Sequence, residues 1–98
     1  MEEGFDFGEA LKRLRDGKKV YREGWNGRGM YLRLIQGYPV NQYYMPVGDE
    51  VVAGQMLPFI IMKTAGDSKT WGEGKSDFVA WLASQTDILA TDWFEFEE

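Results

Sequence analysis

The sequence predicts an α+β fold in which a mostly antiparallel sheet packs against an N-terminal helix and a short C-terminal helix. Three observations predict it: an amphipathic N-terminal stretch, several short apolar runs separated by turn residues, and a second capping pattern near the C-terminus. Because turns rather than long helices join the apolar runs, a doubly wound parallel sheet is disfavoured. The length of 98 residues fits a single domain, residues 1–98, with a modest core.

The N-terminal helix is predicted at residues 7–16. Asp6 is the candidate N-cap, and Glu9, three residues later, completes a capping-box pattern. Gly17 fits the position at which such a helix ends. Apolar residues recur at helical spacing and form one stripe: Phe7, Ala10, Leu11 and Leu14.

The strands are predicted from short apolar runs. In chain order they are residues 19–22, 30–35, 59–64, 78–82 and the closing segment 92–98, which is expected to bury Trp93. Residues 36–58 are rich in glycine and proline and are predicted to be irregular, with a short strand at 51–53. Residues 65–77 are predicted to be an exposed loop that carries Trp71, and a short helix is predicted at 85–90.

Composition excludes several classes of chemistry. The chain has no cysteine and no histidine, so it lacks thiolate ligands, a cysteine nucleophile and the commonest general base. Its net charge of −5 disfavours general DNA or RNA binding, because phosphate neutralisation supplies most of that affinity. Neither a signal peptide nor a membrane-spanning run is recognisable, so a cytoplasmic protein without membrane contact is expected.

The stretch REGWNGRGM at 22–30 has two interpretations. Asn26 and Gly27 are typical of a tight hairpin, which is a complete structural explanation for those two residues. The hairpin does not explain Trp25, whose indole would be costly to expose at a turn tip. A glycine-rich bend also exposes backbone N–H groups to an anion, and an indole offers a face to a base. Two arginines are candidates for phosphate contacts: Arg22 and Arg28.

A second polar stretch, WLASQTD at 81–87, also has a structural and a functional interpretation. Ser84 and Asp87 fit the N-cap of the predicted short helix. A helix N-terminus can equally bind an anion, and Gln85 and Thr86 could bind a base edge or a ribose hydroxyl. A third candidate is the strand end at Lys63 and Thr64. The carboxylates are scattered along the chain, so neither a catalytic group nor a metal cluster is predicted.

Together these segments resemble the phage Thoeris anti-defence two family. The resemblance is carried by FGEALKRLRDGKKVYREGWNGRGMYL, FIIMKT and WLASQTDILATDW, at about residues 5–35, 57–64 and 78–96. It implies a protein that sequesters a nucleotide-like immune signal, glycocyclic ADP-ribose, without cleaving it, and some relatives also hold cyclic dinucleotides. It further implies a homo-oligomer, typically a tetramer, with ligand sites near subunit contacts and no cofactor.

The resemblance carries ligand-site roles onto matching positions of this sequence. These positions, with Arg28 and Trp71 added from the residue patterns, form the expected ligand-binding set: Trp25, Asn26, Gly27, Arg28, Lys63, Thr64, Trp71, Trp81, Ser84, Gln85 and Asp87. The expected place of action is the cytoplasm of the infected bacterial host. Two alternatives stay open: a phosphodiesterase that degrades the signal, and a structural or protein-binding phage module.

Overall fold

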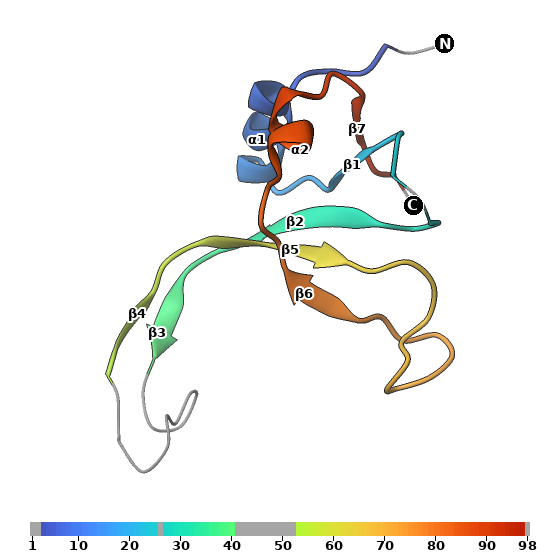
Figure 1. Cartoon of the computed structure of the whole chain (residues 1–98). Coiled ribbons are helices and arrows are strands. Elements are labelled where there is room, and N and C mark those ends of the chain that lie inside the picture. The colour runs from blue at the N-terminus through green and yellow to red at the C-terminus, as the bar shows by residue number, and fades with distance from the viewer. Residues whose placement is uncertain (1–2, 26, 41–52, 98) are drawn as a thin grey trace.

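The computed structural model describes residues 3–25, 27–40 and 53–97. It confirms the predicted α+β class, with a helix near each end of the chain and antiparallel strands between and after them (Figure 1). The elements in chain order are α1 (Phe7–Arg15), β1 (Val20–Arg22), β2 (Tyr31–Ile35), β3 (Tyr38–Val40), β4 (Gly54–Met56), β5 (Phe59–Lys63), β6 (Phe78–Ala80), α2 (Gln85–Leu89) and β7 (Trp93–Glu95).

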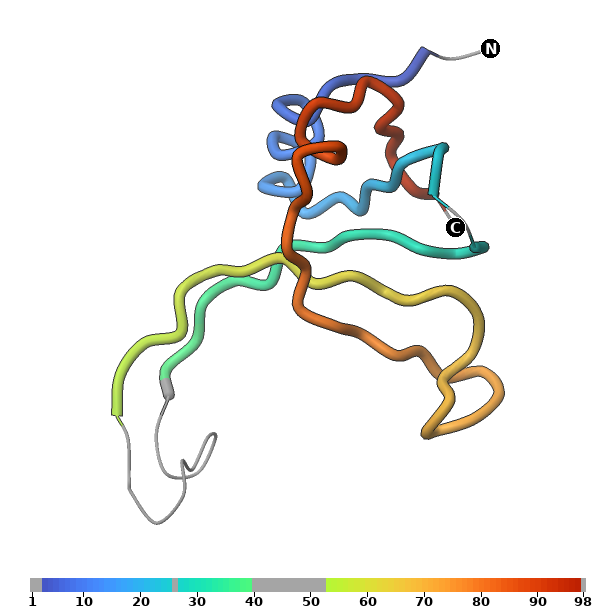
Figure 2. The backbone as a smooth tube through the Cα atoms, in the orientation of Figure 1, coloured from blue at the N-terminus to red at the C-terminus, as the bar shows by residue number. Residues whose placement is uncertain are grey.

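The main sheet has five strands in the order β6-β5-β2-β1-β7, and every neighbouring pair is antiparallel. The last strand of the chain therefore lies beside the first, with Arg22 opposite Trp93. Figure 2 shows the chain path that produces this order, in which the red C-terminal segment returns to the blue N-terminal one. This return brings residues from both ends of the sequence to one place.

Helix α1 begins at the predicted residue, Phe7, and ends at Arg15, one residue before the predicted end. The Asp6 side chain accepts a hydrogen bond from the Glu9 backbone N–H at 2.9 Å, and the Glu9 carboxylate pairs with Arg13 one turn later at 2.9 Å. The helix stops at Gly17, which has φ of +86°, a conformation that glycine adopts without steric cost. Short helix α2 is also confirmed within the predicted segment 85–90.

The core forms where α1 covers one face of the sheet. Five fully buried side chains make its centre: Ala10, Leu14, Val20, Leu32 and Trp93. Because side chains alternate across a strand, the residues next to these in sequence face the opposite side of the sheet. That opposite face carries half-buried aromatic rings, including Tyr21, Tyr31 and Phe94.

Two predictions about the loops are wrong. Residues 36–58 were expected to be irregular, but β3 and β4 pair as a separate two-stranded hairpin with Tyr38 opposite Met56. Proline within β3 and glycine within β4 hid these strands, although a two-stranded ribbon tolerates both because each strand has a free edge. The strand predicted at 51–53 lies largely outside the described residues, and β4 begins at Gly54.

The tight hairpin predicted at Asn26 and Gly27 is also wrong. Strand β1 ends at Arg22 and β2 begins at Tyr31, so a long connection replaces a two-residue turn. Asn26 itself lies outside the described residues, and Gly27 has φ of +118°. The connection is long because its Trp25 packs back against the core, which an isolated tight turn would not allow.

Candidate functional site

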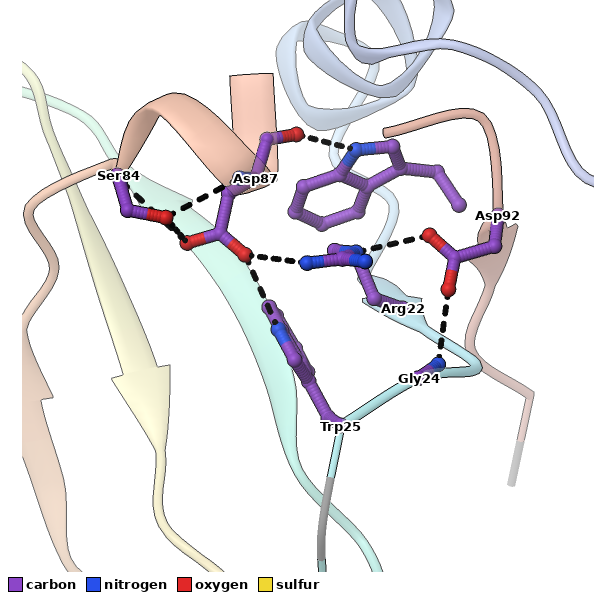
Figure 3. A network of polar contacts seen from close by, with 7 residues as sticks. Arg22, Gly24, Trp25, Ser84, Asp87 and Asp92 are labelled. Atoms are coloured by element: carbon purple, nitrogen blue, oxygen red, sulfur yellow. Dashed lines mark hydrogen bonds and ion pairs between the residues drawn. The ribbon is translucent and has the colours of Figure 1, made fainter. Parts of the chain in front are cut away.

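The two motifs singled out in the sequence meet in space. Trp25 of the β1–β2 connection and Asp87 of α2 are joined by a hydrogen bond of 3.3 Å from the indole N–H to the carboxylate. Arg22 donates to the same carboxylate oxygen at 2.9 Å and forms an ion pair with it. Figure 3 shows these contacts converging between β1, the connection and α2.

Asp92 completes this network from the start of β7. The Arg22 Nε donates to one Asp92 oxygen at 2.8 Å, and the Gly24 backbone N–H donates to the other at 2.8 Å. The Arg22 guanidinium therefore bridges two carboxylates, one within α2 and one just before β7. We call Arg22, Trp25, Asp87 and Asp92 the Arg22 network (Figure 3).

Ser84 fixes the remaining oxygen of Asp87. The Ser84 hydroxyl donates to Asp87 Oδ2 at 2.8 Å. The same hydroxyl accepts from the Asp87 backbone N–H at 3.1 Å, and the Ser84 backbone N–H donates to Asp87 Oδ2 at 3.4 Å, which together form the predicted capping box. Both carboxylate oxygens of Asp87 thus have partners within the chain. The structural interpretation of this motif is confirmed, and Asp87 serves the helix cap and the Arg22 network at once.

Trp25 is turned inward. Its ring packs edge-on against Trp93, with centroids 5.4 Å apart and planes at 82°. The Trp93 indole N–H donates to the Asp87 backbone oxygen at 3.0 Å, so both indoles are tied to α2. This answers why a tryptophan sits in a glycine-rich loop: it anchors the loop to the core.

The Arg22 network shifts the pKa of each charged member toward the ionised form. The hydrogen bonds that Arg22 donates to Asp92 and then to Asp87 raise the pKa of Arg22. Burial alone would raise the pKa of Asp87, but hydrogen bonds from Arg22, Ser84 and Trp25 outweigh it and lower that pKa. The Arg22 hydrogen bond is the largest cause that lowers the pKa of Asp92. Neither carboxylate is therefore suited to take up a proton near neutral pH.

Beyond Trp25 the connection packs on the end of β5. We call Gly27, Arg28 and Gly29 the glycine loop. The Gly66 backbone N–H donates to the Arg28 carbonyl at 3.4 Å, and a Cβ added at Gly27 would come within 2.6 Å of the Ala65 side chain. The close approach requires glycine, because any larger residue would push the loop away from the β5–β6 segment.

Lys63 lies beside the glycine loop. Its ammonium donates to the Thr64 carbonyl at 3.1 Å and to the Gly66 carbonyl at 3.4 Å. A Cβ on Gly29 would lie 3.5 Å from this ammonium, which places the positive charge against the loop backbone. Arg28 is exposed on the same loop. Two predicted motifs, the glycine-rich stretch and the Lys63–Thr64 strand end, therefore form one cationic edge.

A cleft of about 510 Å³ lies along β1 and β7 and reaches the glycine loop. Aromatic rings and loop glycines are among the residues that line it, including Tyr21, Phe94, Phe96, Gly27 and Gly29. The rings form a cluster in which Tyr21 stacks on Phe94 at 5.9 Å between centroids and meets Phe96 edge-on at 6.0 Å. The cleft thus offers flat apolar faces next to backbone that approaches closely.

Both arginines that line the cleft already form ion pairs with carboxylates of the chain. Arg22 belongs to the Arg22 network, and Arg13 pairs with Glu9 and with Glu95, at 3.4 Å in the latter case. Carboxylates also line the cleft, among them Glu3, Glu23 and Glu97. An anionic group would therefore be directed away from the cleft's carboxylates and toward Arg28 and Lys63 at the loop.

Three other residues of the expected ligand-binding set are not among those that line the cleft. Trp81 packs in the core, edge-on to Trp93 with centroids 6.1 Å apart. Gln85 is exposed on α2, and Trp71 is 77% exposed in the loop between β5 and β6. Sequence reasoning missed Asp92 and the aromatic pair Phe94 and Phe96. The alternation of phenylalanine and glutamate at 94–97 was the available signal for rings on one strand face.

Within residues 3–25, 27–40 and 53–97, no three histidine, cysteine, aspartate or glutamate side chains gather as metal ligands would. The described helices are also too short or too polar to cross a membrane.

The fold and site define a class of small α+β domain: an antiparallel sheet covered on one face by α1, with a glycine loop that borders an aromatic cleft. Sequence comparison identifies the family to which the chain belongs. The Thoeris anti-defense 2-like domain family matches residues 5–96, so the chain belongs to that family. The chain is also 39% identical over 101 residues to Thoeris anti-defense 2 of Bacillus phage SP01, covering 95% of this chain and 96% of the phage protein. Membership supports an anti-defence function directed against Thoeris.

Proposed function

We propose that this protein acts in the cytoplasm of an infected bacterium by binding and sequestering a cyclic ADP-ribose-type signal, glycocyclic ADP-ribose, without cleaving it. The observation that carries the proposal is the position of the glycine loop, which borders the aromatic cleft, carries Arg28 and lies against the Lys63 ammonium. The family relationship supports the Thoeris context. Cyclic dinucleotides, which share purine bases and phosphates with this signal, are proposed as further ligands.

The proposed binding mode divides the ligand between two surfaces. A purine would stack on the rings of Tyr21, Phe94 or Phe96, because aromatic faces bind bases of any sequence. The phosphates would lie at the glycine loop, where Arg28 and Lys63 carry positive charge and glycine backbone can approach an anion. The cleft volume of about 510 Å³ falls within the range of sites for small molecules.

Several features favour binding over cleavage. Histidine and cysteine are absent from the sequence, so the commonest general base and nucleophile are missing. The two aspartates bonded to Arg22, Asp87 and Asp92, have lowered pKa values and are therefore weak bases near neutral pH. Their oxygens already accept hydrogen bonds from Arg22 and its neighbours. A preformed site held by such a network suits tight binding, because little order is lost on association.

A capture-and-release assay tests the proposal. The purified protein in excess is mixed with glycocyclic ADP-ribose, unbound nucleotide is removed by filtration, and the retained fraction is heated and analysed by mass spectrometry. Recovery of the intact nucleotide is expected. Recovery of a cleaved product would instead support the phosphodiesterase, and absence of retention for this signal and for cyclic dinucleotides would support a structural module.

The same proposal includes the expected homo-oligomer, a tetramer. Sequestration requires the free signal to fall below the level that activates the defence, which needs tight binding; a Kd near 1 nM corresponds to about −12 kcal/mol. Enclosing the open cleft with a second subunit would exclude water from the phosphate contacts and strengthen them.

A further inference from the structure

The loop between β5 and β6, residues 64–77, is held by hydrogen bonds rather than by buried apolar side chains (Figure 1). Its largest apolar side chain, Trp71, is 77% exposed. By contrast, Ser68 is 5% exposed and is the one buried polar residue among those that the structure describes. A buried hydroxyl is costly unless it is hydrogen-bonded, so the partners of Ser68 show what holds this loop.

The Ser68 hydroxyl ties the start of the loop to its last residue. It donates to Asp77 Oδ1 at 2.6 Å, and it accepts from the backbone N–H groups of Trp71 at 2.7 Å and Thr70 at 3.1 Å. Asp77 Oδ2 accepts from the Lys69 backbone N–H at 2.9 Å. The hydrogen bond from Ser68 is the first cause that lowers the pKa of Asp77, so this carboxylate is ionised at neutral pH. We call Ser68 and Asp77 the serine clasp.

Asp77 also closes the base of the loop through its backbone. Its carbonyl accepts from the Thr64 backbone N–H at 3.0 Å and from the Thr64 hydroxyl at 3.4 Å. Only residues 65–67 lie between Thr64 and Ser68. Because Thr64 and Ser68 both bond to Asp77, this short segment is fixed at its two ends.

The fixed segment contacts both parts of the cationic edge. The Gly66 backbone N–H donates to the Arg28 carbonyl at 3.4 Å, and the Gly66 carbonyl accepts from the Lys63 ammonium at 3.4 Å. The Ala65 side chain packs against the glycine loop so closely that a Cβ on Gly27 would lie 2.6 Å from it. A shift of this segment would therefore move the Lys63 ammonium and the glycine loop together.

We propose that Ser68 and Asp77 are positioning residues: the serine clasp holds the Lys63 ammonium and the glycine loop in the arrangement that binds the phosphates. This inference rests on the proposed nucleotide binding. Neither Ser68 nor Asp77 is among the residues that line the cleft, and both side chains bond within the loop. They raise affinity without touching the nucleotide, because a site that is already ordered loses less freedom on binding.

Two substitutions in the full chain, Ser68→Ala and Asp77→Asn, test the clasp. Their matched controls are Ser76→Ala and Asp67→Asn, the same changes at exposed positions of the same loop. The buried core residues all lie outside this loop, so thermal melting should show folded protein for every variant. Calorimetry with glycocyclic ADP-ribose should show that each clasp variant binds about fivefold more weakly than its control.

A double substitution distinguishes positioning from a general loss of stability. If the clasp acts through Lys63, Ser68→Ala should weaken binding by a smaller factor in a Lys63→Ala protein than in the wild type. Factors that simply multiply in the double variant would overturn the inference. So would a folded Ser68→Ala protein that binds the nucleotide as tightly as the Ser76→Ala control.

A measurement without ligand separates this inference from the proposed function. Nitrogen-15 relaxation gives order parameters for the backbone amides of Gly29 and Gly66, with Val20 in the core as the internal reference. In Ser68→Ala protein we expect both glycine values to fall from about 0.85 to below about 0.6, while the Val20 value is unchanged. Unchanged glycine values would overturn the inference. If the wild type retains no nucleotide, the proposed function fails, and a fall at the two glycines would still support the positioning role.

Discussion

The indole N–H of Trp25 donates a hydrogen bond of 3.3 Å to the carboxylate of Asp87, and this contact joins a loop near the N-terminus to a helix near the C-terminus. Arg22 reinforces it with an ion pair to the same oxygen. The contact determines where the connection leaves the core, and so where the glycine loop lies. Ligand binding and stability should therefore be linked through these residues.

Asp87→Ala tests that link. The substitution removes the carboxylate that accepts hydrogen bonds from the Trp25 indole N–H and from Arg22. Because both donors lose this acceptor, we expect a loss of about 2 kcal/mol in the free energy of unfolding. Because the glycine loop loses its anchor, affinity for the nucleotide should also fall at least tenfold. Urea unfolding and calorimetry measure the two effects. Full affinity in a folded Asp87→Ala protein would show that the loop is placed independently of α2.

Two substitutions of Trp25 separate its hydrogen bond from its packing. Trp25→Phe keeps an aromatic ring against Trp93 and removes the N–H, so we expect a loss of about 1 kcal/mol in unfolding free energy. Trp25→Ala also removes the ring and should weaken ligand binding at least tenfold while the oligomer persists. Equal effects of both substitutions on binding would assign the whole role to the hydrogen bond.

The Arg22 network predicts a pH dependence of stability. The pKa values of Asp87 and Asp92 are lowered by folding, so the unfolded chain binds protons more readily on acidification. Their contribution to the free energy of unfolding is fully present at pH values well above the ordinary aspartate pKa of about 3.9. It is lost as the pH falls through the lower pKa values of the folded chain. Denaturation at a series of pH values should show the unfolding free energy falling on acidification below that point.

Asp92→Asn is the control for this pH dependence. Asparagine keeps the shape and the acceptor oxygen for Arg22 but does not titrate in this range. The variant should be less stable than the wild type at neutral pH, and its free energy of unfolding should fall less steeply on acidification. An unchanged slope would place the titrating group elsewhere.

Charge removal at the glycine loop tests the phosphate site. Arg28→Ala and Lys63→Ala should each weaken nucleotide binding about tenfold, or about 1.4 kcal/mol, with little change in melting temperature, because each removes a charge from the proposed phosphate position. Lys75→Ala is the matched control, the same charge removal at an exposed position of the loop between β5 and β6. Calorimetry at two salt concentrations measures the affinity of each variant. If Arg28→Ala and Lys63→Ala bind the nucleotide as tightly as the Lys75→Ala control, the phosphates do not bind at this loop.

Much of the fold could be predicted because its signals are local. The Asp6 cap, the apolar stripe of α1 and the Gly17 stop lie within one short segment, and the Ser84 and Asp87 cap within another. Strands β2 and β5 are apolar runs between turn residues. The β3–β4 hairpin could not be found because proline and glycine are typical of turns as well as of narrow ribbons.

The site was harder to predict because its contacts are distant in sequence. The sequence motif around Trp25 suggested a pocket wall, and Trp25 is among the residues that line the cleft. No sequence signal indicated that its indole also donates a hydrogen bond to Asp87, 62 residues away. The pairing of Arg22 with Asp92, 70 residues away, depends on β7 returning beside β1. A strand order of this kind follows from the packing of the whole sheet and is not encoded in any single motif.

The capture-and-release assay with glycocyclic ADP-ribose tests the central claim most directly. The proposal predicts that excess protein retains the nucleotide through filtration and that heating returns it intact, at the same mass and in full yield. Release of a hydrolysed product would contradict sequestration.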